Sequence, residues 1–417
     1  MPPAVPPCSS RSSSAGSPCR SRRVQRGDRA DHDPPVAVRS VSRGRRYHQG
    51  VSRTGGVVCD ATMSDAGRTP GSTSAPDPSR PVPPLADPAA FPPLDLTRRP
   101  WAGRQVTAGG VTLHVRETPG APARAVYVHG LSGSATNWTD LAGLLAGRAA
   151  GTSVDLPGFG LSPPLEPRVW TPDANADALA RFLRASGDEP VHLLGNSLGG
   201  TVCVLLAARH PDLVRTLTLV SPAVPDRRPD PRRLSDPRLA LAMVPGSPGR
   251  RARAALAAMG PRERAEQVLT LCFGDPSRAP EHRIVEAAEE IVARGAMPWA
   301  GEAVNGAAFA MFAGWLRFGP ASLWAAMRAV TAPTLVLWGD RDRLVSPRRA
   351  DRTVRSLRAG RLLMLPGVGH IAQMEVPDVV ACAVAGMWDA VDAGEWAGDV
   401  ARDGKMRAAP RVEQVES

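Results

Sequence analysis

The sequence predicts an α/β protein, built on a mostly parallel sheet that helices cover on both faces, with an inserted helical lid. Short, continuously apolar segments alternate with helical segments from about residue 100 to residue 394. Such alternation is typical of parallel sheets, because strands that are buried on both faces are apolar throughout. Residues 222–330 break the pattern, since they hold helical periodicities and no convincing strand. We expect this stretch to be the lid, inserted between two strands.

Two segments flank the predicted lid and supply the strands. In residues 96–221, RQVTAGGVTLHVRE predicts a hairpin around Gly109 and Gly110. RAVYVHG, GTSVDLPG, PVHLLG and VRTLTLVSP predict strands, while NWTDLAGLLAGR and PDANADALARFLRASG predict helices. In residues 331–394, APTLVLWGD and GRLLMLPG predict strands, and PRRADRTVRSLRAG and PDVVACAVAGMWDAV predict helices. The core is therefore predicted to be one domain in two sequence segments.

The two ends of the chain have a different composition. Residues 1–95 are dense in Pro, Ser, Gly and Arg. Such a segment buries too little apolar surface to offset its chain entropy, so we expect it to be disordered. Fewer arginines follow Met63, and we predict that translation starts there. Residues 395–417 are polar and predict a loose tail.

The charge of the chain does not predict a nucleic-acid partner. The formal net charge is +11, but residues 1–62 alone contain eleven Arg and four Asp. Lys405 is the only lysine, which indicates an arginine-rich genome composition rather than a nucleic-acid surface. No apolar run approaches the roughly 18 residues of a membrane span, and no secretory signal is visible. We expect a cytoplasmic protein.

The cysteines predict neither a metal site nor a disulfide framework. Six cysteines occur, with no CxxC pair and no Cys/His cluster at zinc-ligand spacing. Cys203, Cys272 and Cys382 lie in apolar contexts, where a buried free thiol is expected. We therefore expect no metal and no cofactor.

The segment LLGNSLGG places Ser197 between a predicted strand and a predicted helix. A serine hydroxyl is a poor nucleophile until a base removes its proton. A tight strand–turn–helix junction can hold such a serine exposed above the sheet, and glycines at 195 and 199 permit the strained turn and close packing. The start of the helix adds free N–H groups that can stabilise a developing oxyanion. Ser197 is therefore the predicted nucleophile.

An acid and a histidine follow Ser197 in the order that this kind of serine hydrolase requires. TLVLWGDRDRLVSP ends a predicted strand with Asp340 and Asp342, and GVGH places His370 after the last predicted strand. With these residues, the chain from about 100 to 394 resembles the α/β-hydrolase superfamily in its lid-bearing branch. In that branch the acid usually falls in a Gly-x-x-Asp pattern, which matches Gly339 and Asp342. The resemblance implies a catalytic triad of Ser197, Asp342 and His370, and Asp340 is the alternative acid.

The segment VYVHGLSGSATNW resembles the His-Gly-x oxyanion motif of this superfamily. The resemblance implies that the backbone N–H groups of Leu131 and Leu198 stabilise the oxyanion. His129 is expected to shape the turn rather than to titrate during catalysis. In the segment DLPGFGLS, which also matches a family turn, Asp155 is expected to have a structural role.

The type of nucleophile narrows the reaction. Haloalkane dehalogenases and epoxide hydrolases of this fold have an aspartate where Ser197 stands, which leaves ester, thioester, lactone and amide hydrolysis and carbon–carbon bond hydrolysis. Gly-Asn-Ser-x-Gly-Gly resembles the carbon–carbon hydrolases that cleave vinylogous diketones. Their Gly-Pro-Gly-Ala stretch is replaced here by LSGSATNW, and no tryptophan follows His370 in GHIAQMEVP.

These observations favour a carboxylic ester hydrolase (EC 3.1.1) that acts through an acyl-enzyme. Three alternatives stay open: a carbon–carbon bond hydrolase, a cofactor-free haloperoxidase-like protein, and a ligand-binding protein that keeps the triad residues. The order of the three residues favours an enzyme, and the missing motifs favour ester cleavage over carbon–carbon cleavage.

The lid segment AVNGAAFAMFAGWLRFGPASLWAAM predicts the substrate class. Ala308, Met311, Phe312 and Trp315 form one helical stripe. A helix that is apolar nearly all round is expected to bury more than one face. We expect Met311, Phe312 and Trp315 to line the substrate pocket, and the substrate to be an apolar ester of medium size.

Overall fold

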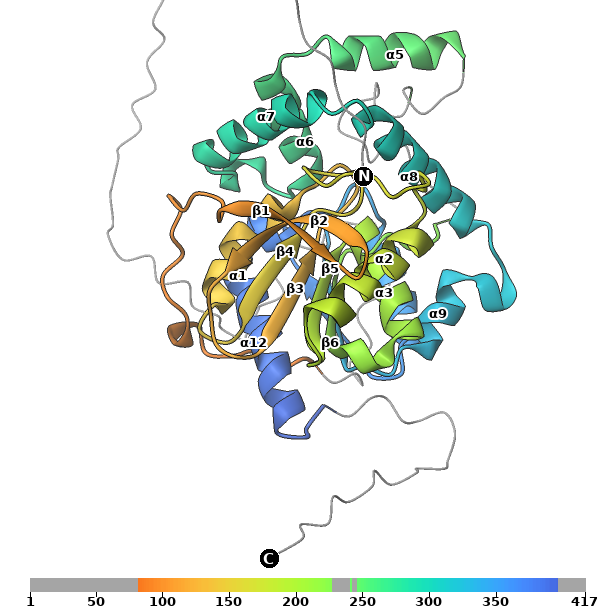
Figure 1. The fold of residues 1–417 in the computed structure, drawn as a ribbon. Helices are drawn as coiled ribbons and strands as arrows, with labels where there is room; N and C mark the ends of the chain where they lie inside the picture. Colours follow the sequence, from red (N-terminus) through yellow and green to blue (C-terminus); the bar gives the residue numbers. More distant parts are fainter. Residues whose placement is uncertain (1–81, 227–240, 242–245, 397–417) are drawn as a thin grey trace, which may run out of the picture. The chain divides into compact units, whose positions relative to one another are not determined.

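The fold is described by a computed structural model, which covers residues 82–226, 241 and 246–396 (Figure 1). Its core is an eight-stranded sheet with the order β1-β2-β4-β3-β5-β6-β7-β8. The pairs β1–β2 and β2–β4 are antiparallel, and the other neighbouring strands are parallel. The mostly parallel sheet predicted from the sequence is confirmed.

The elements follow one another much as the sequence predicts. The strands are β1 (Gly103–Ala108), β2 (Val111–Thr118), β3 (Arg124–Val128), β4 (Ala150–Val154), β5 (Val191–Asn196), β6 (Val214–Val220), β7 (Thr334–Gly339) and β8 (Gly360–Leu365). The helices of the core are η2 (Ala135–Trp138), α1 (Thr139–Leu145), α2 (Pro172–Ser186), α3 (Leu198–Arg209), α10 (Ala350–Arg355), α11 (Ala372–Glu375) and α12 (Pro377–Asp392).

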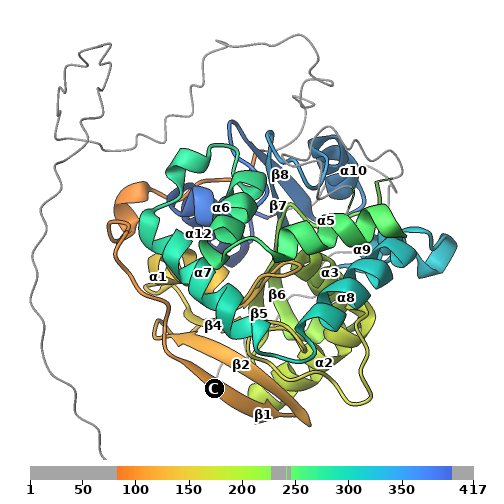
Figure 2. The same cartoon turned by 90° about the horizontal axis from the view of Figure 1, so that it is seen from above.

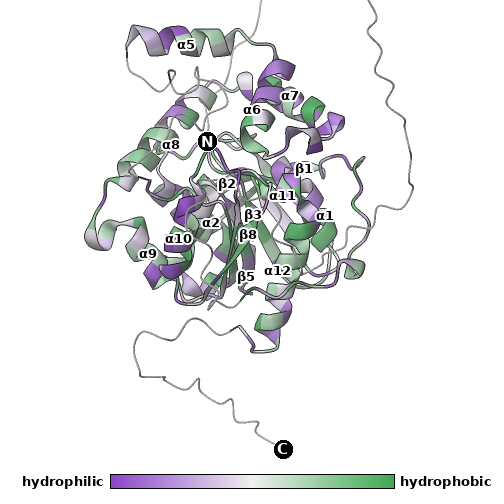
Figure 3. Ribbon diagram, turned by 180° about the vertical axis from the view of Figure 1, so that it is seen from behind, coloured by the Kyte–Doolittle hydropathy of each residue, from purple (hydrophilic) through white to green (hydrophobic). Residues whose placement is uncertain are grey.

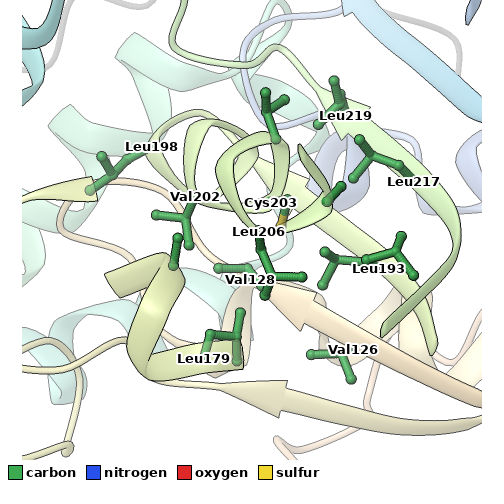
Figure 4. Packing of buried hydrophobic residues seen from close by; sticks show 14 of the residues in the cluster. Val126, Val128, Leu179, Leu193, Leu198, Val202, Cys203, Leu206, Leu217 and Leu219 are labelled. Atoms are coloured by element: carbon green, nitrogen blue, oxygen red, sulfur yellow. The ribbon is translucent and has the colours of Figure 1, made fainter. Parts of the chain in front are cut away.

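Side chains alternate between two apolar clusters, one on each face of the sheet. On β3, Val126 and Val128 belong to the cluster under α2 and α3, while Ala125 and Tyr127 belong to the cluster under α1 and α12. This alternation follows from the two-residue period of a strand. Figure 4 shows the first cluster, where Val126, Val128 and Leu193 lie close to side chains of α3. The strands are largely hydrophobic in Figure 3, as expected for a sheet covered on both faces.

A helical insertion separates β6 from β7. Its described helices are α5 (Ser247–Ala257), α6 (Pro261–Cys272), α7 (Glu281–Gly295), α8 (Ala300–Trp315) and α9 (Leu323–Ala329). Between β6 and β7, the described residues form no strand. Helices α5 to α8 lie over one end of the sheet (Figure 2). In the part of the chain that the structure describes, no helix has the length and apolar character needed to cross a membrane.

Part of the segment predicted to be disordered is packed. Ala86 donates its backbone N–H to the Cys382 carbonyl at 2.9 Å, and Phe91 and Leu94 pack against the cluster under α12. These contacts bury apolar surface of residues 82–95, so the predicted boundary at residue 95 is wrong for that stretch. At the other end, Trp396 is buried and donates to the Ala359 carbonyl at 2.9 Å. Met63 and residues 397–417 lie outside the described residues.

A buried histidine in the sheet makes stability depend on pH. His192 on β5 is 3% exposed, its ring stacks on Trp388 at 4.1 Å between centroids, and its Nδ1 lies 2.8 Å from Thr216 Oγ1. Burial, the largest cause, and the charge of Arg215 together lower the pKa of His192 to about 4, although the charge of Asp392 opposes the shift. The folded protein therefore binds this proton less readily than the unfolded chain.

We expect acid to destabilise the protein through His192. Between pH 6.5 and about pH 4 the unfolded chain binds the proton and the folded protein does not, so the free energy of unfolding falls as the pH falls. The loss attributable to His192 reaches about 3 kcal/mol below pH 4. Urea unfolding of wild type and His192→Phe, which keeps an aromatic ring, measures it. The variant should show a shallower loss over this range, and equal slopes would contradict the assignment.

Candidate active site

Ser197 occupies a strained turn between β5 and α3. Its φ and ψ are 53° and −118°, a conformation that a residue with a side chain rarely adopts. A Cβ atom on Gly195 would lie 2.6 Å from Cys203 Sγ, and one on Gly199 would lie 2.3 Å from the Val128 carbonyl oxygen. The two glycines thus allow helix α3 to pack directly on the strands, as the sequence predicts.

Asp342 and His370 meet at the carboxyl ends of β7 and β8. His370 Nδ1 lies 2.8 Å from Asp342 Oδ2, and both residues are at most 3% exposed. Asp342 Oδ1 accepts the backbone N–H groups of Leu344 and Val345 at 2.8 and 2.9 Å. Because a carboxylate only accepts hydrogen bonds, His370 Nδ1 carries the proton, and Nε2 is left as the basic nitrogen.

Asn196 connects this pair to the turn at Ser197. Its Nδ2 donates to the His370 carbonyl and to the Val220 carbonyl, both at 3.0 Å, and the residue is 3% exposed. The backbone N–H of Ser197 also donates to the Val220 carbonyl, at 3.1 Å. The side chain before the serine therefore holds the backbone of the histidine beside the serine.

Asp340, the alternative acid, lies in a different setting. It is exposed, and its Oδ1 accepts the backbone N–H of Gly367 at 2.7 Å. A carboxylate that caps a turn in this way organises the loop after β8 and does not contact His370 Nδ1. Of the two predicted candidates, the structure places Asp342 against the histidine.

Leu131 lies in a tight turn after β3. The Gly130 carbonyl accepts the Gly133 N–H at 3.0 Å and His129 Nδ1 at 2.7 Å. Since a trans peptide points its N–H opposite to its C=O, these two bonds direct the Leu131 N–H away from the turn. Leu198, the other predicted oxyanion donor, opens α3, where the first N–H groups have no partner within the helix.

The side chains of His129 and Asp155 form hydrogen bonds with backbone groups in and around this turn. His129 Nε2 accepts the Leu156 N–H at 3.0 Å, so its proton is on Nδ1. Burial lowers the pKa of His129, which favours this neutral form. Burial alone would raise the pKa of Asp155, but hydrogen bonds from His114, Leu161 and Ala135 and the proximity of His129 outweigh it and lower the pKa. Both residues thus hold backbone in place.

Helix α8 carries the three residues predicted to line the pocket. Met311 packs against the apolar cluster under α2 and α3, to which the buried Ala303 and Ala307 also belong. Phe312 and Trp315 contact each other edge to face, with ring centroids 4.9 Å apart, and Phe312 is 37% exposed. The expectation that this helix buries more than one face is wrong, because Phe309 is 76% exposed. The small side chains at Ala303 and Ala307 let one face lie close to the core, and the opposite face remains open.

A cavity of about 540 Å³ lies between residues 96–100, strand β2 and helix α7. Ser134, Glu290 and Arg294 are among its lining residues, and Ser197, Asp342 and His370 are not. In the described residues, no group of three His, Cys, Asp or Glu side chains is placed to hold a metal ion.

Comparison with known proteins identifies the family. The sequence model of the alpha/beta hydrolase fold matches residues 126–377, which include Ser197, Asp342 and His370. The chain belongs to the α/β-hydrolase family. It has the fold of this family, as the order of the strands and the resemblance in the sequence predict.

Three similar proteins illustrate the range of similarity. Lipase LipV of Mycobacterium tuberculosis H37Rv is 44% identical over 115 residues, which cover 27% of this chain and 43% of LipV. The 2-(acetamidomethylene)succinate hydrolase of Mesorhizobium japonicum is 27% identical over 299 residues, 71% of this chain and 98% of that protein. The solved structure of the meta-cleavage product hydrolase CumD from Pseudomonas fluorescens IP01 matches with a TM-score of 0.55 and 18% identity, over 69% of this chain and 98% of CumD. At that identity the likeness shows the fold alone.

Sequence reasoning missed Glu375, a buried residue that joins the helical insertion to the segment that carries His370. The carboxylate accepts three backbone N–H groups: Gly369 at 2.8 Å, and Gly274 and Asp275 at 2.9 Å. His370 itself donates its N–H to the Cys272 carbonyl at 2.6 Å. The only signal in the sequence is an acidic residue in the apolar stretch after His370.

Cys272, at the same junction, is not a second nucleophile. Burial and, to a smaller extent, the charge of Asp342 raise the pKa of its thiol to about 12. A thiol is nucleophilic only when it ionises, so Cys272 is inert near neutral pH. Cys203 and Cys382 are also buried thiols, and among the described residues neither forms a disulfide, as predicted.

Proposed function

We propose that this hydrolase cleaves carboxylic esters through an acyl-enzyme on Ser197. One observation carries the proposal: a buried Asp342–His370 pair, 2.8 Å apart, is held beside the strained serine turn by the side chain of Asn196. A serine needs a base that is itself oriented by a third group, and this arrangement supplies both.

The proposed reaction follows from the proton positions. His370 Nε2 accepts the proton of Ser197 Oγ while Oγ bonds to the ester carbonyl carbon, whose π electrons move to the oxygen. When the tetrahedral intermediate collapses, the C–O bond to the alcohol breaks and the alkoxide takes the proton from Nε2. Water then attacks the acyl-enzyme with His370 as base, which releases the carboxylic acid and restores Ser197. Asp342 keeps Nδ1 protonated throughout and stabilises the imidazolium.

The developing oxyanion is proposed to bind the backbone N–H groups of Leu131 and Leu198. The hydrogen bonds that Gly130 accepts point the Leu131 N–H away from the turn, and the Leu198 N–H is the first of α3. Fixed backbone donors need no reorganisation when charge develops, so they stabilise the transition state more than the ester.

An apolar acyl or alcohol group is proposed to lie under α8, against Met311, Phe312 and Trp315. Met311 reaches the cluster that also contains Leu198, next to the serine. The similarity to LipV, a lipase, supports an ester substrate. We further infer that the helical insertion acts as a lid over this site.

A substrate panel tests the proposal. With p-nitrophenyl esters from acetate to octanoate, we expect the highest kcat/KM between butyrate and octanoate, because a longer chain buries more apolar surface under α8. A preference for acetate or for charged esters would contradict the proposed substrate class.

A vinylogous diketone in the same panel tests the alternative of carbon–carbon cleavage. Asn196 was the residue that favoured that alternative, but its amide holds the His370 backbone, a role that either reaction would need. We expect the diketone to be cleaved far more slowly than the butyrate ester. Faster cleavage of the diketone would replace the ester proposal with the carbon–carbon hydrolase.

A further inference from the structure

Helix α7 of the insertion lies along residues 132–140, the segment that directly follows the predicted oxyanion donor Leu131. Arg283, Glu290 and Arg294 are spaced seven and four residues apart, so they share one face of the helix. Each contacts the segment 132–140, in reverse order along the chain. The helix and the segment are therefore joined at three points.

The first two contacts fix the helix in place. Arg283 is 5% exposed and pairs with Asp140 of α1, with Nη2–Oδ1 at 2.5 Å and Nε–Oδ2 at 3.3 Å. Such two-point pairing of a guanidinium with a carboxylate sets orientation as well as distance. Seven residues on, Glu290 accepts the Ser134 hydroxyl, which lies 2.8 Å from both carboxylate oxygens.

The third contact acts on the turn itself. Arg294 Nη1 donates to the Ser132 carbonyl and reaches the Gly133 carbonyl at 3.5 Å. Ser132 has a φ of 60°, a left-handed conformation that costs a non-glycine residue energy and persists only when surrounding contacts hold it. Arg294 supplies such a contact from outside the core.

A short chain of bonds links Arg294 to the oxyanion donor. Arg294 holds the carbonyls of Ser132 and Gly133, the Gly133 N–H donates to the Gly130 carbonyl at 3.0 Å, and that carbonyl belongs to the same peptide as the Leu131 N–H. Because the peptide is planar, fixing its carbonyl fixes the direction of its N–H. If the turn relaxes, the Leu131 N–H turns away from its position.

We propose that Arg294 is a positioning residue for the oxyanion donor Leu131, so that the insertion and the oxyanion site move together. This rests on the proposed function, in which Leu131 stabilises the oxyanion. A displacement of α7 would then lower turnover without removing any group that contacts the substrate.

The test compares Arg294→Met, which keeps an unbranched apolar stem but no donor, with Arg294→Lys and with Arg264→Met. Arg264 is an exposed arginine on α6 and serves as the matched control. Because Arg294 lines the cavity of about 540 Å³, a smaller side chain at this position fits without a steric clash. On the butyrate ester, Arg294→Met should lower kcat by about 10- to 100-fold. This fall should not exceed the one that follows the complete removal of an oxyanion donor. KM should stay near the wild-type value, and the Ki of an alkylboronic acid, which forms a tetrahedral adduct, should rise with the fall in kcat.

Arg294→Lys, which keeps a charged donor, should recover part of the activity, and Arg264→Met should behave as wild type. An unchanged kcat in folded Arg294→Met, or a rise in KM alone, would overturn the proposal. If Arg294→Met does not fold, Arg294→Lys, which keeps the charge but not the planar guanidinium, must itself show a partial fall in kcat at constant KM, and a wild-type kcat in that variant overturns the proposal.

Amide hydrogen exchange separates this inference from the proposed function. In Arg294→Met, exchange in peptides that cover residues 130–134 should be at least about tenfold faster than in wild type, because the Gly133 N–H loses its fixed partner. This readout does not depend on activity. If wild type hydrolyses no ester, the proposed function fails while the exchange still decides the positioning role; equal exchange rates would overturn that role in an active enzyme.

Discussion

Replacing Ser197 with alanine is expected to lower kcat on a butyrate ester by a factor on the order of 10⁶. The change removes the oxygen that forms the acyl-enzyme, and neither His370 nor the backbone donors can replace it. The turn keeps its geometry, because the backbone N–H of Ser197 still donates to the Val220 carbonyl. Steady-state kinetics with purified wild type and variant, together with thermal unfolding of both, measures the effect.

Ser221 provides a matched control for this change. It follows β6, the strand beside β5, and it also has a positive φ of 43° and a buried hydroxyl. Ser221→Ala removes the same hydroxyl from a neighbouring strained turn and should keep most of the activity. If Ser197→Ala remained active while folded, or if Ser221→Ala lost as much, the assignment of Ser197 as nucleophile would be wrong.

Replacing Asp342 with asparagine is expected to lower kcat by a factor on the order of 10⁴. The amide oxygen can still accept the N–H groups of Leu344 and Val345, so the loop keeps its hydrogen bonds. The amide nitrogen then faces His370 Nδ1 and donates to it, which places the histidine proton on Nε2, the atom that must accept the proton of Ser197. The serine loses its base although the fold is preserved.

Asp340→Asn tests the choice between the two aspartates. Asp340 accepts the Gly367 N–H through one oxygen, and an amide oxygen can do the same. We expect a small effect on kcat and no change in the pH profile. A loss in Asp340→Asn that equals or exceeds the loss in Asp342→Asn would show that the acid has been assigned to the wrong residue.

The sequence predicts the sheet well because its signals are local. Continuous apolar runs mark β3, β5 and β7, which are buried on both faces. The glycines around Ser197 mark a turn at which a helix packs so closely on a strand that no side chain fits. Asp342 could be separated from Asp340 only through the family pattern, since both lie within three residues in the same loop. The structure supports that choice with the contact between Asp342 and His370.

Contacts between distant segments were not predictable in the same way. Glu375 binds backbone about 100 residues away, and Arg294 binds the turn about 160 residues earlier, with no periodicity that could reveal either contact. The buried face of α8 is not predictable from the sequence, because apolar composition does not show which face of a helix is covered. There the small residues Ala303 and Ala307 decide the buried face, while the large Phe309 is exposed.

The packed N-terminal segment illustrates the same limit. Phe91 and Leu94 stand among prolines and polar residues, and composition alone places them with the residues expected to be disordered. The cluster against which they pack includes side chains of α12, nearly 300 residues later in the chain. Average composition over a window cannot detect two apolar side chains that pack against a cluster formed by distant parts of the chain.

The most direct test of this account is the site at which a fluorophosphonate modifies the protein. Labelling of the folded protein, followed by proteolysis and mass spectrometry, should place the phosphonyl group on the peptide that contains Ser197. The label should be absent from Ser197→Ala and slow to form on Asp342→Asn, because the histidine can no longer accept the serine proton. A folded wild-type protein that takes up no label, or that takes it up on another residue, would contradict the claim that Ser197 is an activated nucleophile.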